Sequence, residues 1–218
     1  MIQRFLESLG GEYPLGEPMT DDLCEFKAAG MRFRVRAYTA SGLGHVSVMS
    51  AAGMLGLMRM DSLIVNPLDL DAPLLSCDRI RAMGRDILVM EMYDTMLGDS
   101  FRTAEIRQAM EKYAELPDGE PKSYWYDDLI VPPSVSKKGA RKTSAAFDGL
   151  MGDYFDAYRA ALRSASACDP AEKARRASVY SEGLLAHGGP ATDPVKKAIG
   201  EEKTARLFRE LLFGVSPD

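Results

Sequence analysis

The pattern of apolar and polar positions changes character along the chain. Between about residue 32 and residue 96, short apolar runs are bounded by glycine, proline or aspartate. In the clearest run, 32–39, Phe33, Val35 and Ala37 alternate with three arginines, the two-residue period of a strand with one buried face. Similar runs occur at 45–49, 54–65, 73–83 and 86–96. They predict five to seven strands in an antiparallel meander, with a hairpin around Gly84 and Arg85.

After Gly98 the apolar spacing becomes helical. We expect four helices in this half of the chain: 100–116, 145–167, Asp169-Pro170 to about 187, and Thr192 or Asp193 to about 213. A further helix is expected at the N-terminus, at 1–9, and ends at Gly10-Gly11. Residues 124–133 carry two terminal prolines and predict a short or edge strand. No repeat or linker interrupts the sequence, so residues 1–218 predict one α+β domain.

Composition narrows the class of function. The net charge of −5 disfavours bulk nucleic-acid binding. The cysteines, Cys24, Cys77 and Cys168, are isolated and there are two histidines, so neither a disulfide framework nor a metal site is expected. The sequence has no glycine-rich phosphate loop, no apolar signal core and no membrane-length apolar run. We therefore expect a cytoplasmic protein without a nucleotide-binding fold.

One carboxylate stands in the apolar run at 73–80. Asp78 lies on a strand predicted to be buried, and an isolated ionised group out of water is unfavourable. Such a carboxyl is paired, protonated or used in chemistry. Pairing with Arg79 or Arg81, or exposure to solvent, would be structural. A carboxyl kept protonated by burial would instead suit a general acid.

Three segments carry a resemblance to a known family. They are Pro73–Ile80 with its Cys77-Asp78 pair, Trp125-Tyr126-Asp127-Asp128 through Pro133, and 180–215 with Ala198-Ile199-Gly200-Glu201-Glu202 and Leu211-Leu212-Phe213-Gly214. In their order and spacing they resemble the ferredoxin-dependent bilin reductases, the family of phycocyanobilin:ferredoxin oxidoreductase. The resemblance implies an α/β/α sandwich with a central antiparallel meander sheet flanked by helices.

The resemblance also implies an activity. It is the reduction of an open-chain tetrapyrrole, a bilin such as biliverdin, by a radical mechanism. Single electrons come from reduced ferredoxin, an iron–sulfur protein, or from flavodoxin, and the enzyme itself binds no cofactor. Asp78 then corresponds to the family's proton donor.

The sequence also departs from the family pattern. Where phycocyanobilin reductase has a histidine paired with the aspartate, this chain has Asp61 or Ser62, and the family's upstream glutamate falls near Ser47. A second family acid, near the start of the last helix, matches Asp193 or His187. His45 is a further candidate. The structural alternatives are a helix cap for Asp193, a helix-end residue for His187 and a satisfied strand histidine for His45.

Basic residues suggest two binding roles. Arginine binds carboxylates bidentately. The candidates to hold the bilin propionates are therefore Arg32, Arg34, Arg36, Arg59, Arg79 and Arg81. For the three arginines at 32–36 the alternative is that they form the solvated face of a sheet. The basic residues Lys137, Lys138, Arg141 and Lys142 could dock an acidic ferredoxin, or simply form a solvated helix start.

Two rival functions remain open at this point. One is a tetrapyrrole-binding or carrier protein that kept the fold and lost the chemistry, which the absent histidine favours. The other is a reductase of a chlorophyll catabolite. The retained Asp78 favours an enzyme.

Overall fold

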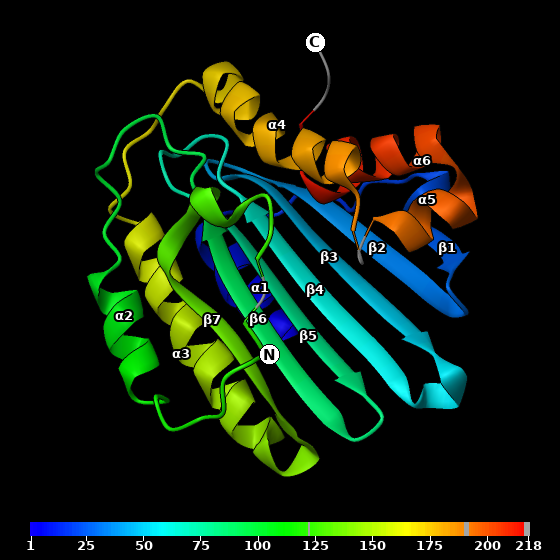
Figure 1. The fold of residues 1–218 in the computed structure, drawn as a ribbon. Coiled ribbons are helices and arrows are strands. Elements are labelled where there is room, and N and C mark those ends of the chain that lie inside the picture. The colour runs from blue at the N-terminus through cyan, green and yellow to red at the C-terminus, as the bar shows by residue number, and fades with distance from the viewer. Residues whose placement is uncertain (122, 190–191, 216–218) are drawn as a thin grey trace.

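A single antiparallel sheet runs through the middle of the molecule. The computed structural model describes residues 1–218 except 122, 190–191 and 216–218. In the described part the sheet has seven strands, which lie in chain order and pair antiparallel throughout (Figure 1). They are β1 (Glu25–Ala28), β2 (Met31–Ala40), β3 (Gly44–Gly53), β4 (Met58–Asn66), β5 (Leu74–Ala82), β6 (Arg85–Tyr93) and β7 (Ile130–Ala140). The predicted meander is confirmed.

Two-residue turns fix the register of two hairpins. Ala29 and Gly30 connect β1 to β2 and both have positive φ, 48° and 73°. Met83 and Gly84 connect β5 to β6 in the same way, with φ of 49° and 78°. Positive φ at both central residues is typical of type I′ turns, whose twist matches that of the flanking strands. The β5–β6 turn therefore lies one residue earlier than the sequence predicted.

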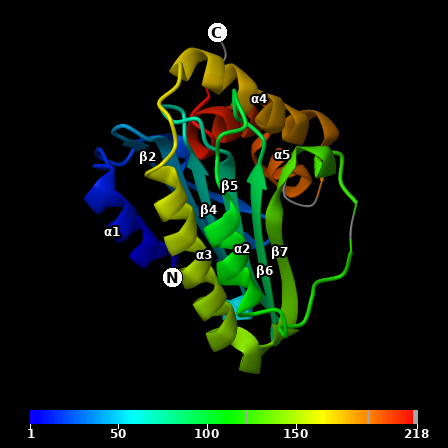
Figure 2. The same cartoon turned by 90° about the vertical axis from the view of Figure 1, so that its left-hand side faces the viewer.

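Helices cover both faces of the sheet, and each face has its own apolar core. On one face lie α1 (Ile2–Glu12), α2 (Ala104–Glu111) and α3 (Ser144–Leu162). On the other lie α4 (Pro170–His187), α5 (Asp193–Ile199), α6 (Glu201–Arg206) and a π-helical turn, Leu207–Leu212. Figure 2 shows α1 and α5 on opposite sides of the sheet. The architecture is the expected α/β/α sandwich. No helix in the described ranges is long and apolar enough to cross a membrane.

Several element boundaries differ from the predictions. The first helix continues through Gly10-Gly11 to Glu12. The second begins at Ala104, with Thr103 rather than Ser100 at its N-cap. The last predicted helix is divided at Gly200, whose φ of 86° ends α5, because few residues other than glycine adopt this conformation. β7 continues past Pro132 and Pro133 to Ala140, and it is the edge strand of the sheet.

Candidate active site

Asp78 lies in the middle of β5, on the face of the sheet that α4–α6 cover. Its partners in register are Ser62 on β4 and Val89 on β6. Successive strand residues point to opposite faces, so the neighbouring Cys77 and Arg79 belong to the face covered by α1 and α3. The backbone of the sheet therefore separates the Asp78 carboxyl from the guanidinium of Arg79.

The C-terminal helices cover only one end of the strands on this face. At one end Ile64, Leu74 and Tyr93 are buried under the C-terminal helices. Farther along the same strands a group of apolar side chains is only half-buried, and we call this group the apolar shelf: Met60, Ile80, Ile87 and Val89. In Figure 1, α4, α5 and α6 cross the upper part of the sheet. Asp78 lies where the covered part meets the shelf.

Burial raises the pKa of the Asp78 carboxyl, because charging it there requires its removal from water. The Ser62 hydroxyl donates a hydrogen bond to Oδ1 of Asp78, which opposes the shift by a smaller amount. Asp78 is half-buried, and no ion pair involves it among the residues that the structure describes. The structural alternative, pairing with Arg79 or Arg81, is therefore wrong.

Glu91 is a second carboxyl on this face, and sequence reasoning missed it. It pairs in register with Ser76 and is thus diagonal to Asp78, at about 7–8 Å for such neighbours. Burial raises the pKa of Glu91, the hydrogen bond from Tyr93 opposes this, and the nearby charge of Asp78 raises it further. Two carboxyls with raised pKa values therefore lie beside the apolar shelf.

An aromatic cluster borders the two acids. Tyr93 stacks on Tyr180 of α4 with centroids 3.9 Å apart and meets Tyr126 edge-on at 5.6 Å. Trp125 packs on α4 at Gly183, where an added Cβ would lie 1.9 Å from the indole ring. The helix can therefore approach the indole only because residue 183 has no side chain. The resulting surface combines flat apolar rings with titratable carboxyls.

The two candidates at the C-terminal helices lie at the junction of α4 and α5. His187 is exposed at the end of α4 and stacks on Trp125 at 4.9 Å. Asp193 is exposed in the first turn of α5, and its carboxylate packs against Gly188. Thr192, not Asp193, occupies the N-cap. Both are on the side of the sheet that bears Asp78, but no contact joins either of them to it within the described ranges.

His45 is buried and hydrogen-bonded, which fits the structural alternative of a satisfied strand histidine. Its ring is 3% exposed, and Nε2 donates to the Leu211 carbonyl at 2.9 Å. Burial lowers its pKa. Ser47 and Asn66 donate to the next two carbonyls, those of Leu212 and Phe213. These three side chains anchor the end of the π-helical turn on the sheet.

The arginines proposed as propionate partners lie on the other face of the sheet. Register pairs Arg34 with Ser50 and Asp61 with Arg79, and the same parity holds for the whole set: Arg32, Arg34, Arg36, Arg59, Arg79 and Arg81. These side chains belong to the face that carries α1 and α3. The backbone of the sheet therefore lies between these candidate propionate partners and the Asp78 carboxyl.

Lys137 and Lys138 belong to the end of β7, whereas Arg141 and Lys142 lie in a short 3-10 helix, Arg141–Thr143, that leads directly into α3. Lys137 pairs with Asp118 at 2.7 Å and Lys138 with Glu120 at 2.6 Å; Arg141 and Lys142 are exposed. Lys138 pairs in register with Ile87 of the apolar shelf. It therefore places an ammonium group on the same face as Asp78.

These features define a class: a seven-stranded antiparallel meander in the described residues, covered by helices on both faces, with acids on the face beneath the C-terminal helices. Neither the protein-family models nor the curated proteins give a match to the chain.

A solved structure does match: phytochromobilin synthase from tomato in complex with biliverdin, with a TM-score of 0.77 over 100% of this chain and 84% of that chain, at 14% identity. The chain thus has the fold of the ferredoxin-dependent bilin reductases, as the resemblance predicted.

Proposed function

We propose that this protein reduces an open-chain tetrapyrrole, such as biliverdin, with electrons from ferredoxin or flavodoxin. The observation that carries the proposal is Asp78: a carboxyl whose pKa is raised by burial, at the border of a half-exposed apolar shelf. A flat conjugated ligand is matched by such a surface. Further support comes from the shared fold with a protein whose crystal structure contains biliverdin.

The two carboxyls account for the protons of the reaction. Reducing one double bond of the tetrapyrrole consumes two electrons from the external donor and two protons. Asp78 gives the first proton from Oδ2, since Oδ1 accepts the Ser62 hydrogen bond, and that bond stabilises the carboxylate that forms. Glu91 gives the second proton. Solvent reprotonates both carboxyls after product leaves, and a raised pKa favours the protonated form that each needs in order to donate.

Charged groups at the border of the shelf complete the proposed site. Lys138 holds a propionate, exchanging its exposed pair with Glu120 for the ligand carboxylate. Arg141 and Lys142 extend this positive charge along the surface and steer an acidic ferredoxin towards the site. The six candidate arginines on the opposite face take no part.

One observation favours the rival function of a tetrapyrrole carrier. The cross-strand partner of Asp78 is Ser62, at the position where the resemblance led us to look for a histidine. A serine positions the carboxylate but carries no titratable proton near neutral pH. The chemistry then depends on Asp78 and Glu91 alone.

Anaerobic addition of biliverdin followed by reduced ferredoxin tests the proposal. We expect a red-shifted visible band on binding and then its bleaching or a change of colour as the pigment is reduced. In Glu91→Gln we expect the band to persist and reduction to stop before the second proton transfer. A stable band that reduced ferredoxin leaves unchanged indicates the carrier, and the absence of any bound band rejects both functions. Replacing biliverdin by an open-chain chlorophyll catabolite tests the alternative substrate.

A further inference from the structure

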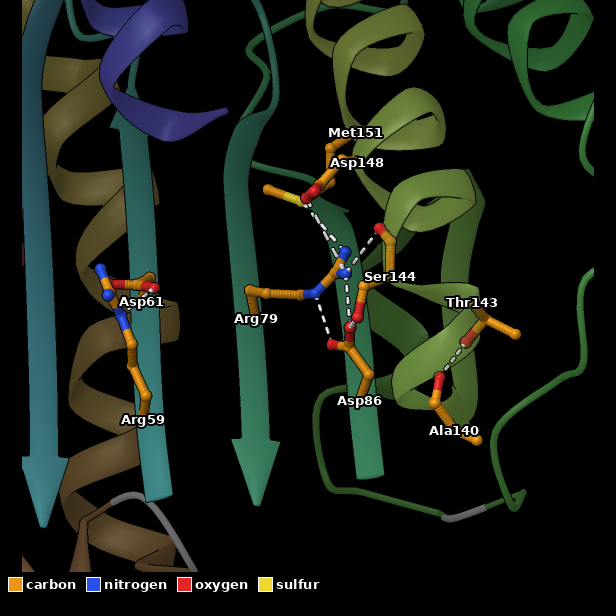
Figure 3. A network of polar contacts seen from close by, with 9 residues as sticks. All are labelled: Arg59, Asp61, Arg79, Asp86, Ala140, Thr143, Ser144, Asp148 and Met151. Atoms are coloured by element: carbon orange, nitrogen blue, oxygen red, sulfur yellow. Dashed lines mark hydrogen bonds and ion pairs between the residues drawn. The ribbon is translucent and has the colours of Figure 1, made fainter. Parts of the chain in front are cut away.

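Five arginines gather on the face of the sheet opposite Asp78. They come from β2, β4 and β5 and line a cleft of about 800 Å³ whose walls include the first turns of α1 and part of α3. We call it the arginine cleft; the residues that line it include Arg34, Arg36, Arg59, Arg79 and Arg81. Figure 3 shows part of this face, with Arg59 beside Asp61 on one strand and Arg79 extending towards α3.

Three of these arginines have carboxylate partners within the chain. Arg79 is 1% exposed and forms a bidentate ion pair with the equally buried Asp86, with N–O distances of 2.6 and 2.7 Å. It also donates to the Ser144 carbonyl (Figure 3). The other two pairs are exposed at their arginine ends, with nitrogen–oxygen distances of 3.0 Å each: Arg34 with Glu25 and Arg59 with Asp61.

Arg81 and Arg36 have no ion pair among the described residues. Arg81 lies directly opposite Arg59 in the β4–β5 register, and like charges in such positions repel. On its other side Arg81 faces Asp86 of β6, but both oxygens of that carboxylate already accept bonds from Arg79. The strand pairing therefore concentrates positive charge here without supplying a carboxylate for Arg81.

The shape and walls of the arginine cleft suit a small molecule. Its volume falls in the range of ligand sites. The buried side chains of Leu6, Val48 and Met151 supply apolar wall beside the arginines. Guanidinium groups recognise phosphate and carboxylate oxygens bidentately.

We propose that the arginine cleft binds a small molecule with two or more phosphate or carboxylate groups, held by Arg81 and Arg59. Such an anion neutralises Arg81, which has no ion pair of its own among the described residues, and contacts the exposed guanidinium of Arg59 beside it. Arg36 supplies a further cation along the floor, and the apolar wall contacts the rest of the molecule. The site lies across the sheet from Asp78 and does not depend on the function proposed above.

Isothermal titration of the full chain at low ionic strength tests the site, with pyrophosphate and citrate as separate probes for phosphate and carboxylate groups. At least one should bind with a Kd below about 1 mM. Arg81→Gln should weaken that binding at least about tenfold, and Arg59→Gln should do the same. The matched control is Arg107→Gln, which removes an exposed arginine of α2 and should leave the affinity unchanged.

Two results would overturn the proposal. One is the absence of binding by either probe up to about 10 mM. The other is equal affinity in the parent, Arg81→Gln and Arg107→Gln, which would assign any binding to charge elsewhere on the surface. Thermal unfolding of each variant without ligand separates loss of the site from loss of the fold. Arg81→Lys keeps the positive charge but loses the bidentate hydrogen bonds of a guanidinium, so it should bind with intermediate affinity.

Discussion

Replacing Asp78 by asparagine should stabilise the folded protein and abolish bilin reduction. Asparagine is nearly isosteric with aspartate, and its side-chain oxygen can still accept the Ser62 hydrogen bond. It removes the group whose ionisation burial opposes. A carboxylate held by an arginine would show the reverse, since its loss would destabilise the fold.

The sign and size of the effect follow from linkage. Below the pKa of unfolded aspartate, about 3.9, the carboxyl is protonated in both the folded and the unfolded state, so its burial as a charge does not lower the free energy of unfolding. As pH rises from there to the higher folded pKa, the unfolded chain releases a proton that the folded chain retains, so stability falls. Each pKa unit of difference is about 1.4 kcal/mol, and each kcal/mol moves the Tm of a domain of this size by about 2–4 °C.

Thermal unfolding of the parent and Asp78→Asn between pH 4 and pH 8 measures this effect. We expect the variant to melt at least about 2 °C higher at pH 7 and the difference to shrink towards pH 4. Glu182 supplies a control of opposite sign, because its hydrogen bond from Arg209 lowers its pKa. Glu182→Gln should therefore lose stability at pH 7 and lose less as pH falls. If Asp78→Asn is less stable than the parent at pH 7, or reduces biliverdin at the parent rate, the assignment of Asp78 is wrong.

Two further predictions follow from the site and the core. Lys138→Gln should weaken biliverdin binding about two- to fivefold, the worth of one partly exposed charge pair, whereas Arg34→Gln, on the opposite face, should leave a visible-band titration unchanged. Asp86→Ala should lower the free energy of unfolding in urea by about 3–5 kcal/mol, because it leaves the buried Arg79 guanidinium without its carboxylate; a loss under about 1 kcal/mol would show that the guanidinium finds another partner.

The alternation of side chains along β5 and β6 is enough to place Glu91 on the same face as Asp78, although the sequence analysis did not use it. In a hairpin the residue numbers of every pair have the same sum, and moving the two-residue turn by one position changes that sum by two. With the turn at Gly84 and Arg85, Glu91 would lie directly opposite Asp78; with the observed turn at Met83 and Gly84 it is diagonal. Either turn puts the two acids on one face, so Glu91 could have been found.

The placement of the arginines could not be predicted in the same way. Alternation shows that Arg34 and Phe33 face opposite sides of β2, but not which side carries the C-terminal helices. That choice depends on long-range packing, such as the bonds from His45 and Asn66 to the end of the π-helical turn. The division of the last helix did have a local signal, because Gly200 interrupts the helical run and adopts positive φ.

The raised pKa of Asp78 depends also on how a neighbouring residue that it does not touch is paired. Arg79 is the next residue in β5, yet burial and the Ser62 bond are the causes that shift the pKa of Asp78. Arg79 points to the opposite face, where Asp86 neutralises it with a bidentate pair. Because a buried charge interacts strongly with its neighbours, a guanidinium without that partner would favour the ionised form of Asp78. The buried pair on one face therefore helps to keep the pKa of the proposed proton donor on the other face raised.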